Sequence, residues 1–203
     1  DHVKLVVVTK KHSAEEIQAA IDEGTEIIGE NQIQEASTKI PLINGFKEFH
    51  FIGHLQSNKI KKLLQLKPAL IHSIDKISTA EKLNEELEKN NSFQEILNQI
   101  NTSGESSKFG IDPEQCDSFF SEITKFSRLQ VKGLMTIGKN TNNESEIRNG
   151  FRKLKTIFDN LKDKQLSNVS MKYLSMGMSD DFEIAIEEGA NIIRVGSAIM
   201  GLR

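Results

Sequence analysis

Eight short apolar segments recur along this 203-residue chain, and stretches with helical spacing separate them. Apolar runs of this kind are typical of strands that are buried on both faces of a parallel sheet, and regular alternation with helices gives parallel pairing through right-handed crossovers. The expected strands lie at 5–10, 27–31, 49–53, 69–74, 93–100, 131–137, 171–175 and 192–196. We therefore expect an α/β fold, a (β/α)8 barrel of the TIM type at the small end of its size range.

A doubly wound open sheet is the alternative fold. Such sheets usually carry a glycine-rich turn after the first strand, whereas Thr9-Lys10-Lys11-His12 stands at that place here. The barrel is therefore favoured.

Several helix starts can be predicted from capping patterns. Ser13-Ala14-Glu15-Glu16 and Ser78-Thr79-Ala80-Glu81 both have the form of a capping box, and Asp112-Pro113 combines a cap with a first-turn proline. Gly24 is expected to end the first of these helices.

Composition excludes some classes of partner. The chain carries 26 basic and 29 acidic side chains and a net charge of −3, which gives no reason to expect nucleic acid or an anionic membrane as partner. The single cysteine, Cys116, falls on the apolar face of an expected helix and indicates a reducing compartment. No apolar run is long enough for a signal peptide or a membrane span, so we expect a cytoplasmic protein.

No linker or low-complexity segment interrupts the chain, so residues 1–203 are expected to form a single domain. The first residue is Asp1 rather than methionine. The sequence is therefore compatible with a native start further upstream and with a missing helix before the first strand.

The carboxyl ends of the strands carry a ring of polar residues, and active sites of such barrels lie at that end. Lys10 ends the first strand. A single lysine at such a place usually extends to solvent, but a partly desolvated amine can attack a carbonyl group and form a Schiff base.

Glycine-serine turns follow the seventh and eighth strands, at 175–179 and 196–197, and each precedes a helix. Free backbone amides at such turns bind anions, and phosphate sites of barrels commonly follow these two strands. A lysine facing two anion-binding turns predicts a phosphorylated carbonyl cofactor, and pyridoxal 5'-phosphate (PLP) fits this description.

The sequence resembles the PLP homeostasis proteins of the YggS/PROSC type. These proteins are similar to an isolated barrel domain of alanine racemase. The matching segments cover nearly the whole chain in the family's order: Val8-Thr9-Lys10, 29–35, 50–59, Asn101 with Ser107-Lys108 and Gly110, 133–135, 174–181 and 194–201. The resemblance implies a PLP-binding barrel of fold type III.

The resemblance also implies roles for single residues. Lys10 would hold PLP as a Schiff base, and Arg194 would lie near the pyridine nitrogen. Asn31 would lie beside the cofactor ring. Gly177, Met178, Ser179, Gly196 and Ser197 would surround the phosphate, and Ser175 completes the expected cofactor site at the end of the seventh strand.

A second lysine, Lys11, stands next to Lys10. Strand alternation puts Val6, Val8 and Lys10 on one face of the first strand and Lys11 on the other, and the family alignment also selects Lys10. His50, His54 and His72 lack the spacing of metal ligands, so structural roles are expected for them and no metal site.

Two functions compete. One is a non-catalytic carrier or regulator of PLP in vitamin B6 homeostasis, with apo forms of PLP-dependent enzymes as recipients. The other is a fold-type III PLP enzyme such as an amino-acid racemase. A sugar-phosphate enzyme with a Schiff-base lysine fits the same residues, but the family resemblance disfavours it.

Racemisation needs a base on each face of the substrate α-carbon. Alanine racemases take the second base from a tyrosine at an additional β domain of the partner subunit. The two residues after Gly201 are too few for such a domain, and the single tyrosine, Tyr173, lies within the seventh strand. We therefore expect a carrier rather than an enzyme.

Overall fold

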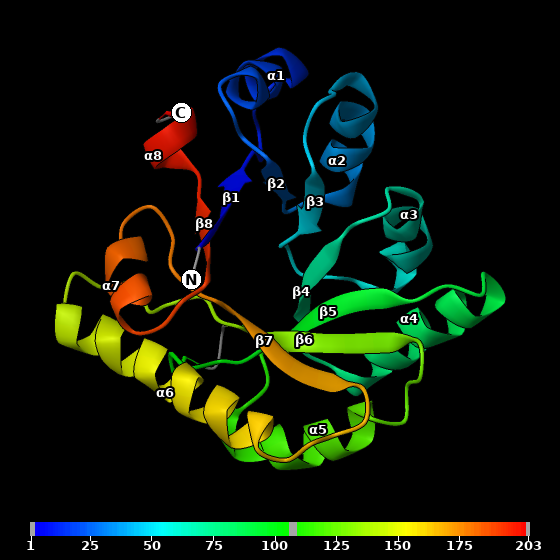
Figure 1. The fold of residues 1–203 in the computed structure, drawn as a ribbon, viewed down its shortest axis with the longest axis vertical. Coiled ribbons are helices and arrows are strands. Elements are labelled where there is room, and N and C mark those ends of the chain that lie inside the picture. The colour runs from blue at the N-terminus through cyan, green and yellow to red at the C-terminus, as the bar shows by residue number, and fades with distance from the viewer. Residues whose placement is uncertain (1–2, 106–108, 202–203) are drawn as a thin grey trace.

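The computed structural model describes residues 3–105 and 109–201 of the chain. Within these residues eight parallel strands close into a barrel in sequence order, and helices surround the ring of strands (Figure 1). The first strand pairs with both the second and the eighth, with Val7 opposite Ile28 on one side and opposite Val195 on the other. This closure confirms the (β/α)8 barrel and excludes the open sheet.

All eight expected strands are present, with ends that differ from the expected ones by at most two residues. The strands are β1 (Lys4–Val8), β2 (Ile27–Glu30), β3 (Glu48–Phe51), β4 (Leu70–Ile74), β5 (Gln94–Gln99), β6 (Leu129–Met135), β7 (Val169–Ser175) and β8 (Ile192–Val195). The helices are α1 (Ala14–Asp22), α2 (Ile33–Lys39), α3 (Ile60–Gln65), α4 (Ile77–Lys89), α5 (Cys116–Ile123), α6 (Glu144–Lys162), α7 (Phe182–Glu187) and α8 (Ser197–Met200). Short 3-10 helices η1 (Ile40–Leu42), η2 (Ser57–Lys59) and η3 (Pro113–Gln115) adjoin α2, α3 and α5.

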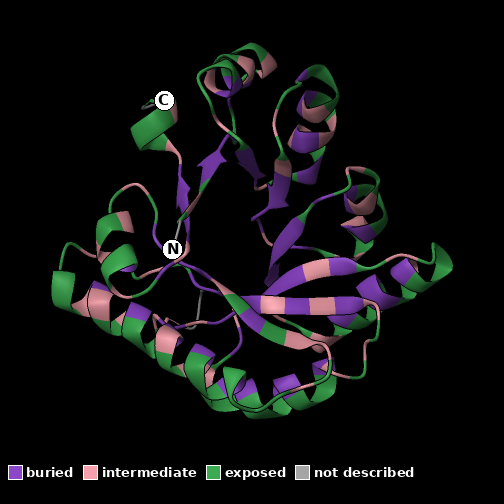
Figure 2. Cartoon of the chain, viewed as in Figure 1, coloured by how far each residue is buried: buried purple, intermediate pink, exposed green. Residues whose placement is uncertain are grey.

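The core has two layers, as expected for this architecture. A small inner cluster fills the barrel, and a larger cluster lies between the strands and the apolar faces of the helices, so the strands are mostly buried while the helices expose their outer faces (Figure 2). The inner cluster consists of Val6, Ile27, Leu70, Leu97, Met135 and Ile192.

One detail of the first strand was predicted wrongly. Val6, Val7 and Val8 are buried, but Leu5 is 41% exposed. Leu5 opens on a cavity that α1 and α8 flank, so β1 is not covered on both faces along its whole length.

The helix starts follow the predictions in two of three cases. The capping box at Ser13 is confirmed, because its hydroxyl accepts from the Glu16 amide and the Glu16 side chain accepts from the Ser13 amide. The Asp112 cap is also confirmed, since its side chain accepts from the Glu114 amide, although the first turn there is 3-10.

The capping box predicted at Ser78 is wrong. The helix α4 begins at Ile77, and the extended residue before it is Lys76. Ile77 packs against the outer core and begins the helix two residues before Thr79, where a cap at Ser78 would begin it. Ser78 therefore lies inside the first turn. Gly24 ends α1 as expected, with a φ of +104°.

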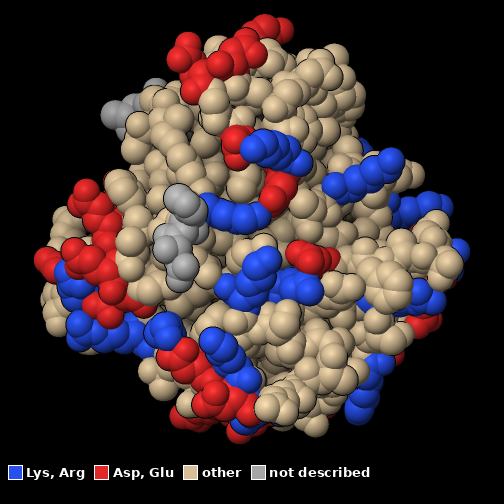
Figure 3. All heavy atoms as spheres, in the orientation of Figure 1, with Lys and Arg blue, Asp and Glu red and all other residues tan. Residues whose placement is uncertain are grey.

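The surface mixes both charge signs. Lysine and arginine side chains are interspersed with acidic ones over the face that Figure 3 shows. Cys116 is free and buried as predicted, and burial raises the pKa of its thiol to about 11. In the described part of the chain, no helix combines the length and the apolar character that crossing a membrane requires.

Candidate cofactor-binding site

Residues that lie far apart in the sequence meet at the carboxyl end of the barrel. A cavity of about 360 Å³ opens there, between the end of β1 and the turns that follow β7 and β8. Its lining includes the expected residues Lys10, Met178, Ser179, Arg194, Gly196 and Ser197, together with Val8, Asp180 and Gly201. The register explains the meeting, because the β1–β8 pairing sets Val6 opposite Arg194.

The two neighbouring lysines lie in different places. Lys10 is exposed and lines the cavity, whereas Lys11 is absent from the lining. Lys11 has a φ of +64°, and its amide donates to Glu35 Oε1 at 2.5 Å. Since β1 ends at Val8, strand alternation does not extend to either lysine. The cavity favours Lys10, as the family resemblance does, whereas strand alternation does not distinguish the two lysines.

A buried ionic cluster holds the backbone that carries Lys10. The Lys39 ammonium lies 3.1 Å from the Thr9 carbonyl oxygen, from Glu30 Oε1 and from Glu35 Oε1. The Thr9 hydroxyl donates to the same oxygen of Glu30 at 2.7 Å. Burial raises the pKa of the Glu30 carboxyl, and the Lys39 charge and the Thr9 hydrogen bond oppose that rise. No role was predicted for this cluster from the sequence, although a glutamate at the end of an apolar strand is a signal for one.

The two turns differ in the reason for their glycines. Gly177 has a φ of +94°, and a Cβ there would lie 2.6 Å from Ala185 Cβ, so the turn after β7 requires glycine. Gly196 has room for a Cβ in van der Waals contact with Val8 at 3.4 Å. The amides of Gly196 and Ala198 both point at the Ser179 hydroxyl oxygen, at 3.2 and 3.4 Å. The turn after β8 thus directs two backbone N–H groups toward one hydroxyl oxygen of the turn after β7.

Arg194 forms part of the cavity wall but is almost wholly buried. Its Nη1 donates to Ser175 Oγ at 2.7 Å, and its Nη2 donates to the Thr136 carbonyl oxygen at 2.9 Å. Burial lowers the pKa of Arg194 to about 10, so it keeps its charge at neutral pH. Ser175 is fully buried and absent from the cavity lining. Its position is thus behind Arg194 and not at the cavity.

Asn31 lies outside this cavity. It follows β2 at the level at which Lys10 follows β1, but it lines a separate cavity of about 230 Å³ together with His54 and Lys59. Its Oδ1 atom is buried and has no hydrogen-bond partner among the described residues. Asn101 bonds within its own loop, to the Glu105 carbonyl. The matching pair Ser107-Lys108 lies outside the described residues.

The histidines have different surroundings. His54 stacks on Phe109 with ring centroids 3.8 Å apart, while His50 and His72 hydrogen-bond to each other inside the barrel. Among residues 3–105 and 109–201, no three His, Cys, Asp or Glu side chains are grouped so as to hold a metal ion.

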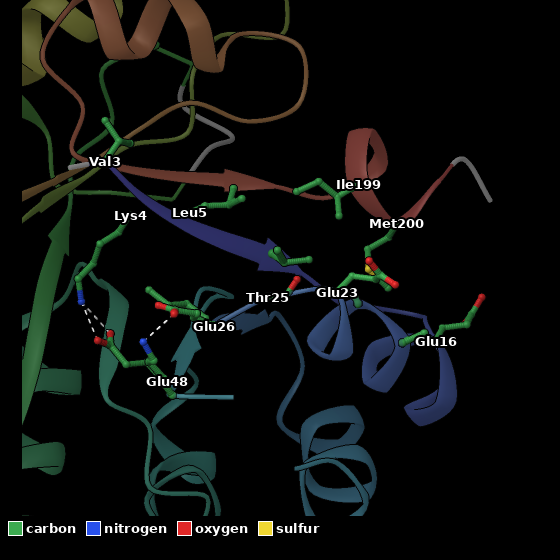
Figure 4. A pocket seen from close by; sticks show the side chains of 16 residues that line it. Val3, Lys4, Leu5, Glu16, Glu23, Thr25, Glu26, Glu48, Ile199 and Met200 are labelled. Carbon is green, nitrogen blue, oxygen red and sulfur yellow. Dashed lines mark hydrogen bonds and ion pairs between the residues drawn. The ribbon is translucent and has the colours of Figure 1, made fainter. Parts of the chain in front are cut away.

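A larger cavity, of about 930 Å³, is separate from the one at the mouth of the barrel, the carboxyl end at which Lys10 lies. Figure 4 shows it beside β1, with Leu5, Ile199 and Met200 on its wall. None of the expected site residues lines it.

The structure is thus a (β/α)8 barrel with a lysine after β1, an arginine on β8 and glycine-serine turns after β7 and β8. The whole chain, residues 1–203, matches the family model described as "Alanine racemase, N-terminal domain". The chain therefore belongs to this family, and its curated relatives are named pyridoxal phosphate homeostasis proteins.

Two of these relatives define the similarity. The one from Helicobacter pylori strain 26695 is 43% identical over 96% of this chain and 86% of its own length, and the one from Aquifex aeolicus is 39% identical over 98% and 87%. Among solved structures, PipY of Synechococcus elongatus PCC7942, without PLP, has a TM-score of 0.90 at 31% identity, covering 98% of this chain and 93% of its own. Alanine racemase from Corynebacterium glutamicum shares the fold, with a TM-score of 0.76 at 15% identity over 99% of this chain and 57% of its own.

Proposed function

We propose that this protein binds PLP at the mouth of the barrel, as a Schiff base on Lys10, and that it carries or regulates the cofactor without turning over a substrate. One observation carries the proposal: a single cavity joins Lys10 to the amides of the β8 turn, with Arg194 in its wall. The structure of PipY with PLP bound, 30% identical with a TM-score of 0.88 over 98% of this chain and 92% of its own, supports the choice of ligand.

The residues present fit this cofactor. The Ser179 oxygen that accepts from Gly196 and Ala198 marks a position where phosphate oxygens would be received. The cavity volume of about 360 Å³ lies within the range of small-ligand sites. The guanidinium of Arg194 would supply a fixed donor for the ring nitrogen, and Asn31 would lie beside the ring.

The chemistry of the linkage needs only the lysine. Lys10 would supply the amine nitrogen for a C=N bond to the aldehyde carbon of the cofactor, with the loss of one water molecule. The cofactor contributes a carbonyl group on which amines can exchange. Because Lys10 is exposed, the linkage would be open to solvent, which suits release to apo enzymes of the cytoplasm.

Two features disfavour racemisation. Tyr173 packs against the inner core, with the Lys4 and Lys172 ammonium groups over its ring, and does not line the cavity at the mouth. A charged Arg194 beside the ring nitrogen would oppose protonation of that nitrogen and weaken the cofactor as an electron sink.

Incubation of the PLP-loaded protein with L-alanine in deuterated water should give no rapid α-proton exchange. Rapid exchange that is lost in the Lys10→Ala variant would instead favour the alternative function, a fold-type III PLP enzyme.

The assignment of Lys10 can be tested directly. The purified protein with PLP should show a visible absorption band that borohydride removes, and peptide mapping should then find the pyridoxyl mass on Lys10. Lys10→Ala should abolish the band, whereas Lys11→Ala, the matched control next to it, should keep it. A pyridoxyl group on Lys11 or Lys59 would contradict the proposal.

A further inference from the structure

A continuous chain of hydrogen bonds crosses the inside of the barrel from the cofactor cavity. Arg194 Nη1 lies 2.7 Å from Ser175 Oγ, which lies 3.0 Å from His72 Nδ1. The opposite ring nitrogen, His72 Nε2, lies 3.0 Å from His50 Nδ1. His50 Nε2 then lies 2.8 Å from Glu48 Oε2. This chain of hydrogen bonds therefore joins residues of β8, β7, β4 and β3.

The far end of this chain lies at the opposite side of the barrel. Glu48 and Lys4 are the first residues of β3 and β1, and the Lys4 ammonium donates to Glu48 Oε1 at 2.7 Å. Figure 4 shows the Lys4 side chain reaching from β1 to Glu48. Both side chains are about one third exposed. The chain thus runs from an ion pair in contact with solvent to a buried guanidinium at the mouth.

The two ends fix which atoms carry the hydrogens. A guanidinium only donates, and a carboxylate only accepts. The hydrogen bond from His50 holds the pKa of Glu48 near 2, with help from Lys4, so Glu48 is charged and His50 Nε2 must carry a hydrogen. Burial lowers the pKa of His50 and lowers that of His72 further, so each ring is neutral and has a single N–H.

The remaining hydrogens then have one arrangement. His50 Nδ1 accepts from His72 Nε2–H, and His72 Nδ1 accepts from the Ser175 hydroxyl. The Ser175 oxygen is left to accept from Arg194. Every donor in the chain points away from the cavity and toward Glu48.

We infer that His72 and His50 are positioning residues for Arg194: they hold the Ser175 hydroxyl in one direction and thereby orient the guanidinium at the cofactor cavity. The inference rests on the proposed place of Arg194 beside the ring nitrogen of PLP. The two acceptors of the guanidinium are a hydroxyl and a backbone carbonyl. Its orientation therefore depends on the direction of these bonds and not on a carboxylate partner.

The first experiment needs no cofactor. NMR of protein labelled with ¹⁵N in the histidine rings should show both His50 and His72 protonated at Nε2 at pH 8. In Glu48→Gln the amide can donate as well as accept, so we expect a second tautomer to appear at His72, two hydrogen bonds away. Glu26→Gln is the matched control, because Glu26 forms an exposed pair with Lys47 and lies outside these hydrogen bonds. A proton on Nδ1 of His72 in the unsubstituted protein would overturn the inference.

The second experiment uses the PLP-loaded protein. His72→Phe keeps a ring but removes both hydrogen bonds, whereas His72→Asn keeps an oxygen near the Nδ1 position that can accept from Ser175. We expect Phe to weaken PLP binding about tenfold, the lower end of what the loss of an outer-shell hydrogen bond costs at metal sites. The His72→Phe variant should also show a shifted visible absorption maximum. The His72→Asn variant should keep most of the PLP affinity and a nearly unshifted maximum.

The outcomes separate the two proposals. Unchanged PLP affinity and an unchanged spectrum in His72→Phe would overturn the positioning role. So would tighter PLP binding by His72→Phe than by His72→Asn. If the unsubstituted protein bound no PLP, the proposed function would fail, and the tautomers measured without cofactor would still decide whether the chain has the stated direction.

Discussion

Gly177 and Gly196 stand in corresponding turns, yet the structure constrains them differently. At Gly177 the positive φ and the contact with Ala185 leave no space for a Cβ. At Gly196 a Cβ would fit against Val8, but it would stand at the cavity where the β8 amides lie. The first glycine therefore serves the fold, and the second leaves room for a ligand.

Gly196→Ala should fold normally and bind PLP roughly tenfold more weakly, a loss of about 1.4 kcal/mol, because the methyl group blocks close approach of the phosphate. Pyridoxal, which lacks the phosphate, should bind weakly to both proteins and show no comparable loss. Titration of both ligands measures this, and Gly150→Ala within α6 is the matched control. Equal affinity of the unsubstituted protein for pyridoxal and PLP would rule out the phosphate site.

At the scale of elements, the turn between β1 and α1 is held by contacts from the next βα unit. It leaves a short strand, contains the positive φ of Lys11 and presents Lys10 to the cavity. The cluster of Glu30, Glu35 and Lys39 supplies that support from β2 and α2. The neighbouring βα unit therefore positions the turn of the first.

Lys39→Met should lower the free energy of unfolding by roughly 3–5 kcal/mol, because it leaves the buried Glu30 carboxylate without its cation. Lys47→Met is the matched control, since it breaks an exposed pair with Glu26 and should cost less than about 1 kcal/mol. Urea unfolding measures both. Adding Glu30→Gln to Lys39→Met should recover part of the loss, and equal stability of the two single variants would contradict the role of the cluster.

At the scale of the whole molecule, the barrel interior combines an apolar layer with two neutral histidines. Burial is the main reason why the pKa of both His50 and His72 is lowered. The unfolded chain takes up protons at these groups below their ordinary pKa of 6.5, while the folded chain does not. The contribution of the two neutral histidines to the free energy of unfolding is therefore fully present above pH 6.5 and is lost as the pH falls below it.

Unfolding free energy should accordingly decrease from pH 7.5 to 5.5, approaching about 1.4 kcal/mol per pH unit for each histidine that stays neutral in the folded state. His72→Phe should show a shallower dependence. Buried carboxyls such as Glu30 and Asp181, whose pKa burial raises, act in the opposite sense but are common to both proteins. Urea unfolding across this range measures the difference, and parallel profiles would contradict the prediction.

The sequence alone was sufficient for the barrel and for most of the cavity. Strand patterns are local, and eight of them in alternation with helices leave few ways to bury both faces of the strands. Lys10, Arg194 and the glycine-serine turns could be named because they lie at or just after the carboxyl ends of strands, and the strand ends of a barrel meet at one rim.

Only the tertiary structure decided the supporting contacts. The sequence did not show that Ser175 lies behind Arg194, that Lys39 holds the backbone of Thr9 or that Ile77 moves the start of α4. His72 and Ser175 are 103 positions apart, and they meet because the register of the closed barrel turns both side chains inward at the same level. Local patterns carry no information on such a pairing, because the direction of a buried polar side chain depends on partners that only the closed barrel supplies.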